Sequence, residues 1–217
     1  ELQNDTAAAA PMYASAARIA LSDDDATRAL DLINKALESG AEKVSALGVK
    51  AQILHNLGRY EEAVQAAGEA LALDPDSIPA LLWKSFALGE LKDWENALQA
   101  CQRILSLQPR MLAASLNMAR VVYELGRKEE AAQIVEDAIK ETPGVPDGAY
   151  AGLAAIYVEL NEADKAIAAA GKALEINPNN LQALTSKTMA LLSQERLADS
   201  LPQLDRMVEL AAENRDT

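Results

Sequence analysis

The sequence predicts an all-α chain, a solenoid of repeated helical hairpins, from three observations. Half of the 217 residues are apolar, only 4% are aromatic, and alanine is abundant, which favours closely packed helices over strands. A turn-like phrase recurs almost unchanged, as "LGRYEEA", "LKDWENA", "LGRKEEA" and "LNEADKA". The phrases follow one another at a step of about 34 residues, a period typical of stacked helical repeats.

Three sets of equivalent positions, called registers below, repeat along the chain at this step of about 34 residues. The alanine that ends each phrase, with its projections to both sides, gives Ala29, Ala63, Ala97, Ala131, Ala166 and Ser200. A second register follows seven residues later, and four units close with Pro75, Pro109, Pro143 and Pro178. One extra residue, in "GVPDG", is the only slip, and a loop would absorb it.

Each unit reads as two amphipathic helices joined by a tight turn, because apolar residues recur three and four apart on both sides of the phrase. Gly58 and Gly126 are expected to close the first helix in the left-handed conformation, with Lys92 and Asn161 in the equivalent places. The closing prolines end the second helix. The register alanines are expected where two helix backbones approach, so they must be small.

This pattern resembles the tetratricopeptide repeat, a helix-turn-helix unit of about 34 residues. The resemblance covers nearly the whole chain and implies a right-handed α-α superhelix whose first helices line a concave face. It divides residues 10–214 into about six units of one solenoid, at 10–43, 44–77, 78–111, 112–145, 147–180 and 181–214. Residues 1–9 are then expected to be a leader or linker and residues 215–217 a tail.

The resemblance also assigns a partner-binding groove to inner positions of the first helices. The residues predicted to form it are Gln52, Asn56, Leu82, Phe86, Leu116, Asn117, Arg120, Tyr123, Val158 and Met189. Apolar side chains beside an amide and an arginine suit an extended peptide or an amphipathic helix. The alternative is that some of these side chains only pack between neighbouring helices.

Some members of the family clamp acidic C-terminal tails of chaperones with several Lys, Arg and Asn residues on these positions. Asn56, Asn117 and Arg120 match that clamp, but the positions of its lysines hold Ala14, Gly48, Pro79 and Ala113. A net charge of −13 further disfavours a strongly acidic ligand, and it argues against nucleic acid and anionic lipid as partners. The absence of a long apolar run predicts a soluble chain that does not insert into a membrane.

Four other features are considered as sites of chemistry. His55 is the only histidine, and the sequence suggests no acid or nucleophile positioned beside it, so it is not expected to act as a general base. Cys101 is expected to be a buried, inert thiol. The run Asp23 to Asp25 lacks the ligand pattern of a calcium loop and suits a helix N-terminus. Trp94 takes the turn position held by Tyr60, so it is expected to pack. No catalytic, metal or cofactor site is predicted.

The sequence therefore predicts a non-catalytic scaffold or adaptor that binds a peptide or helix of a partner protein. The resemblance and the alanine-rich composition suggest a bacterial assembly or chaperone-like factor, cytoplasmic or in the periplasm and cell envelope. One alternative is the docking or regulatory arm of a larger enzyme or secretion component. A second is a structural oligomer that associates through its terminal repeats, since the sixth unit offers no polar cap.

Overall fold

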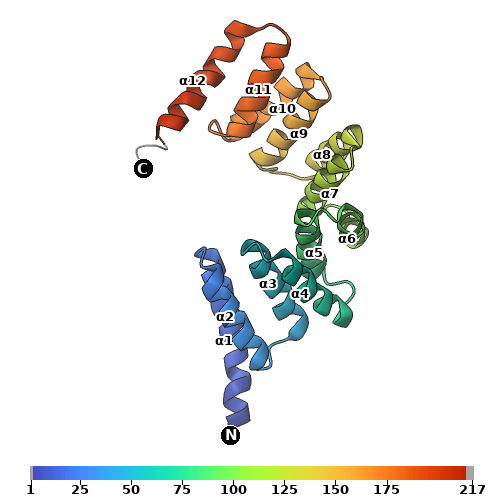
Figure 1. The fold of residues 1–217 in the computed structure, drawn as a ribbon, viewed down its shortest axis with the longest axis vertical. Helices are drawn as coiled ribbons and strands as arrows, with labels where there is room; N and C mark the ends of the chain where they lie inside the picture. The colour runs from blue at the N-terminus through green and yellow to red at the C-terminus, as the bar shows by residue number, and fades with distance from the viewer. Residues whose placement is uncertain (1, 214–217) are drawn as a thin grey trace. The chain divides into compact units, whose positions relative to one another are not determined.

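The computed structural model describes residues 2–213, with side chains described from residue 9 onward. These residues form helices and no strand, in six consecutive pairs (Figure 1). The first helices of the pairs are α1 (Leu2–Ser22), α3 (Lys43–Asn56), α5 (Ile78–Glu90), α7 (Leu112–Glu124), α9 (Asp147–Glu159) and α11 (Leu181–Ser193). The second helices are α2 (Ala26–Glu38), α4 (Tyr60–Leu73), α6 (Trp94–Leu107), α8 (Lys128–Glu141), α10 (Ala163–Ile176) and α12 (Leu197–Glu213). The predicted all-α hairpin-repeat fold class is confirmed.

The helix boundaries follow the repeat period closely. Helices α5, α7, α9 and α11 begin at the first residue of the expected units, and α3 begins one residue early. The segment expected to be a leader or linker differs from that prediction. Its backbone is helical from Leu2, and the helix runs unbroken through Pro11 into the first unit. The expected tail, residues 215–217, lies outside the described residues.

A left-handed residue joins the two helices of every pair. Positive φ angles between 57° and 80° occur at Asp24, Gly58, Lys92, Gly126, Asn161 and Glu195. The next residue donates its backbone N–H to a carbonyl near the end of the first helix, as Arg59 does to Leu54 at 2.9 Å and Asp93 to Leu88 at 2.9 Å. This bond closes the helix and turns the chain. The prediction at Gly58, Lys92, Gly126 and Asn161 is confirmed, and the structure adds Asp24 and Glu195.

The small-residue register is buried in every repeat. Ala29, Ala63, Ala97, Ala131 and Ala166 are fully buried, and Ser200 is nearly so. The second helices α4, α6, α8 and α10 each end two residues before a closing proline. The prediction that the closing prolines end the second helices is confirmed, and the full burial of the register fits its expected place between packed helices.

The chain divides into two compact units, residues 1–121 and 122–217, which are considered separately below. In unit 1, α4 packs against α3 and α5, and α3 also packs directly on α5. In unit 2, α10 packs in the same way against α9 and α11, and α9 packs on α11. Within each unit the first helices therefore form one layer and the second helices cover it.

Candidate functional site

An aromatic cluster lies on the first-helix layer of unit 1. His55 of α3 is in ring contact with Trp83 and Phe86 of α5, with centroid separations of 5.4 Å and 6.0 Å. Trp83 and Phe86 are 5.5 Å apart and tilted, and Tyr60 of α4 approaches His55 edge-on at 5.5 Å. All four side chains are half-buried. The cluster thus offers partly exposed ring surface, which apolar and aromatic ligand groups favour.

Arg120 of α7 lies beside the last turn of α5 in the same unit. Its Nη1 atom is 3.4 Å from Oε1 of Glu90, and its Nη2 atom donates to Oδ1 of Asn117 at 3.2 Å. The guanidinium lies against Gly89, where an added Cβ would collide with it. A glycine at 89 therefore admits the arginine, which is partly paired but retains outward donors because its side chain is 38% exposed.

Asn117 is not a surface residue, although the sequence placed it in the groove. It is only 3% exposed, and its Nδ2 atom donates to Oγ of Ser85 at 2.9 Å and to Sγ of Cys101 at 3.5 Å. Its remaining oxygen accepts from Arg120, so its hydrogen-bonding groups are used inside the fold. Burial raises the pKa of the Cys101 thiol, while contacts with Ser85 and Asn117 lower it less. An unreactive, structural cysteine follows.

The other predicted groove residues of unit 1 divide between packing and exposure. Leu82 packs against the core cluster of Leu81, Ile104 and Ala114, as Trp83 packs against the core between α3, α4 and α5, and both side chains stay half-buried. Gln52 is half-buried and Asn56 is exposed at the end of α3. Leu116 of α7, another predicted groove residue, is also half-buried.

In unit 2, two predicted residues line one open hollow. Val158 of α9 and Met189 of α11 lie around a hollow of about 410 Å³ together with Glu159 and Ser193. Met189 is half exposed. The flexible thioether beside a valine can adapt to an apolar ligand group, and the Glu159 carboxylate at the rim is paired with Lys128.

Tyr123 is occupied by a cation within unit 2. The Nζ atom of Lys128 lies 5.5 Å from its ring centroid and also pairs with Glu159 at 3.0 Å. That carboxylate raises the pKa of Lys128. Tyr123 thus presents a ring whose face is partly covered by a neighbouring side chain.

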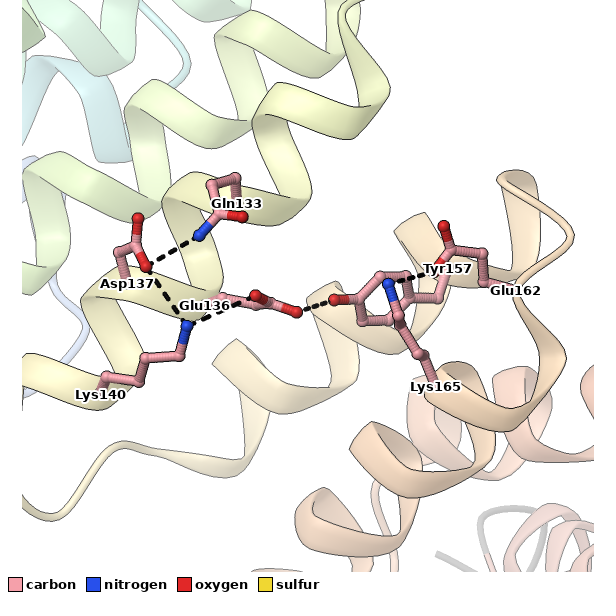
Figure 2. Close-up of polar contacts among 7 residues, drawn as sticks. All are labelled: Gln133, Glu136, Asp137, Lys140, Tyr157, Glu162 and Lys165. Atoms are coloured by element: carbon pink, nitrogen blue, oxygen red, sulfur yellow. Dashed lines mark hydrogen bonds and ion pairs between the residues drawn. The ribbon is translucent and has the colours of Figure 1, made fainter.

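A partly buried polar link between α8 and α9 was not predicted from the sequence. The Tyr157 hydroxyl donates to Glu136 Oε1, and Lys140 stands 3.5 Å from the other oxygen of that carboxylate (Figure 2). Burial raises the pKa of Tyr157 strongly, and the Glu136 carboxylate adds to this effect. Lys165 covers the tyrosine ring at 5.1 Å and pairs with Glu162 at 2.5 Å. The sequence signal was a tyrosine in a register that the other units fill with alanine, leucine or valine.

The described residues contain no group of three or more His, Cys, Asp and Glu side chains placed to hold a metal ion. Among the described helices, none combines the length and apolar character needed to span a bilayer. The features described on the first helices are apolar and aromatic surface with single polar contacts.

Comparison with known families accounts for most of the chain. Three models described as tetratricopeptide repeat match residues 14–78, 88–157 and 148–180. The chain is a tetratricopeptide repeat protein. The resemblance found in the sequence is therefore confirmed. A search of the curated proteins finds no match.

Solved structures show the same fold. A structure from Pseudomonas aeruginosa, described as a functional characterization of pilF, is 18% identical with a TM-score of 0.78, covering 98% of this chain and 100% of its own. A thermophilic tetratricopeptide protein of Thermus thermophilus, TTC0263, is 22% identical with a TM-score of 0.71, covering 84% and 99%. YrrB, described as a protein with an unusual peptide-binding site, is 23% identical with a TM-score of 0.62, covering 81% and 90%.

The family is generally a non-catalytic scaffold fold, and the tetratricopeptide fold supports a role in protein–protein interaction. At these identities the solved structures establish fold alone.

Proposed function

We propose that this tetratricopeptide repeat protein is a non-catalytic adaptor that binds a peptide or helix of a partner protein on the first-helix layer of unit 1. The observation that carries the proposal is the cluster of His55, Trp83 and Phe86. A partly exposed ring cluster on a preformed helical surface anchors an apolar side chain at low entropic cost.

The chemistry of the surface defines the ligand. The rings accept a leucine, methionine or aromatic side chain, while Arg120 offers donors at the last turn of α5, the helix that carries Trp83 and Phe86. Because Arg120 is already paired with Glu90, it suits one neutral acceptor such as a backbone carbonyl better than a cluster of carboxylates. The chain's net charge of −13 also disfavours an acidic ligand. The expected ligand is an apolar segment that is neutral or basic.

The remaining exposed positions of the predicted groove are candidate contacts around this anchor. Gln52, Asn56 and Leu116 belong to unit 1 with the rings, and their neutral side chains suit the backbone and apolar groups of a peptide. In unit 2, the Val158 and Met189 hollow is a separate candidate contact, and Tyr123 is a weaker one because Lys128 covers part of its ring.

The likeness to YrrB, which is described as having an unusual peptide-binding site, supports a peptide ligand. Matches to proteins of Thermus and Pseudomonas support a bacterial adaptor role. These similarities concern the class of ligand and not the identity of a partner.

A peptide-display selection on the purified chain tests the proposal. Random peptides would be selected on the wild type, and the affinity of the enriched sequences would be measured for Phe86→Ala and for Trp94→Ala. Trp94 is a half-buried aromatic residue of a second helix, so its truncation controls for general loss of aromatic packing.

We expect enriched peptides with apolar anchors whose affinity falls about 30-fold in Phe86→Ala, the loss typical of a hot-spot contact of about 2 kcal/mol. Trp94→Ala should bind as the wild type does. Equal affinity for Phe86→Ala, or no enrichment at all, would remove the cluster as the binding site.

A further inference from the structure

The last helix of the series carries an uncovered apolar stripe. Leu197, Leu201, Leu204 and Val208 recur three and four apart on α12 and are therefore on one face of the helix. They are 67%, 56%, 38% and 69% exposed. Four large apolar side chains exposed along one face of a helix form a candidate contact surface for another element.

The repeat period shows what kind of element covers such a stripe. In α4 the same four positions hold Tyr60, Val64, Ala67 and Leu71. These residues belong to the packed cluster that also contains residues of α5, the first helix of the following repeat. The α12 stripe is therefore the half of a repeat-to-repeat interface that receives a first helix.

The first helix of the chain carries the opposite half of this interface. Met12 and Ile19 lie seven residues apart on α1 and are 72% and 61% exposed. Their equivalents in α5 are Ala80 and Ala87, both fully buried in the cluster with α4.

The same pair of positions is buried in every later first helix. The equivalent residues of α3, α7, α9 and α11 are each at most 9% exposed: Ala46 and Ile53, Ala114 and Val121, Ala149 and Ile156, Ala183 and Ala190. The exposure of Met12 and Ile19 is thus a property of the first repeat alone.

We propose that α1 of one copy of this chain packs on α12 of a second copy, continuing the repeat stack from molecule to molecule. Both halves of one recurring interface are open on the same chain, so a second copy supplies the missing half without a new geometry. Charge is compatible, because residues 9–22 carry only Arg18 whereas α12 carries Asp199, Asp205, Glu209 and Glu213 against Arg206. This association does not depend on the proposed peptide site.

The two surfaces differ, so the contact is head-to-tail, and it generates either a ring or an open chain. That asymmetry gives a decisive test. Ile19→Glu blocks the α1 half and Val208→Glu blocks the α12 half, and both positions are exposed enough to leave the fold intact. Leu73→Glu, at another exposed leucine, at the end of α4, is the matched control.

Light scattering over a concentration series, with circular dichroism to verify folding, reads out the association. We expect the wild type and Leu73→Glu to exceed the one-chain mass of 23.2 kDa as concentration rises. Each blocked variant alone should stay at one chain. Their equimolar mixture should form dimers and stop there, because Val208→Glu contributes a free α1 and Ile19→Glu a free α12.

A wild type that remains at one chain at the highest concentration overturns the proposal. Association of Ile19→Glu alone overturns it too, since α12 pairing with α12 would then suffice. A second measurement avoids charge substitutions. Ile19→Cys and Leu204→Cys chains treated with a short bis-maleimide should form the dimer link only when mixed, since the native Cys101 is buried. Linking of either variant with itself, or no link in the mixture, contradicts head-to-tail packing.

Discussion

Replacing Tyr157 by phenylalanine tests the partly buried link between α8 and α9 in unit 2. The substitution keeps the ring and removes only the hydroxyl that donates to Glu136. A hydrogen bond to a charged group contributes about 1.5–3 kcal/mol. Glu136 is 29% exposed and recovers some hydration when the hydroxyl is lost. We therefore expect the free energy of unfolding to fall by about 1–2 kcal/mol.

The assay is urea denaturation followed by circular dichroism, with Tyr150→Phe as control. Tyr150 lies on the same helix, is half-buried and is expected to change stability by less than about 0.5 kcal/mol. A double-mutant cycle with Glu136→Ala should give a coupling of about 1 kcal/mol or more. Equal stabilities of Tyr157→Phe and the wild type, or additive effects in the cycle, would refute the reasoning.

The pH dependence gives a second reading of the same contact. Burial and the neighbouring carboxylate raise the pKa of Tyr157, so its contribution to stability is present below the unfolded pKa of about 10. As pH rises beyond that value the unfolded tyrosine ionises first, and the contribution is lost as pH approaches the raised folded pKa. The stability gap between the wild type and Tyr157→Phe should therefore narrow above about pH 10, whereas a constant gap would contradict the assigned contact.

Three further predictions concern the repeat framework. Lys92→Gly should stabilise unit 1 by about 0.5–1 kcal/mol, because glycine relieves the left-handed backbone strain at φ 60°. Gly58→Lys should destabilise the protein by a similar amount. Urea titrations in which neither substitution changes the free energy of unfolding would contradict this prediction. Ala97→Leu should destabilise by about 1–3 kcal/mol through overpacking, and a melting temperature equal to that of the wild type would show that the contact is loose. Cys101 should react with a soluble maleimide at least about 100-fold faster in urea than in the native protein, because it opens only when the surrounding structure does, and fast native labelling would show that it is accessible.

The period and turns were predictable because they depend on local sequence. The small residues, the closing prolines and the turn between the two helices each recur about every 34 residues. Stacking of neighbouring repeats then determines which faces of the helices are buried. The left-handed residues Asp24 and Glu195 stand one repeat step from Gly58 and Asn161, so the register that predicted Lys92 could have predicted them as well. The turn's hydrogen bond imposes this conformation on side chains other than glycine and asparagine.

The side-chain partners were less predictable because they come from neighbouring repeats. Asn117 sits at an inner register position, yet Ser85 and Cys101, from the preceding repeat, draw its amide into the interior. Tyr157 looked like an apolar packing residue until Glu136 supplied an acceptor for its hydroxyl. No local pattern in the sequence specifies such pairs.

The most direct test of the proposed binding surface is to locate a bound peptide. A peptide selected on the wild-type chain would carry a photoreactive group at its apolar anchor, and cross-linked residues would be identified by mass spectrometry. We predict cross-links to Trp83, Phe86 and neighbouring residues of α3 and α5, reduced in Phe86→Ala. Cross-links confined to the second helices α4 and α6, or unchanged in that variant, would contradict recognition by the first-helix layer.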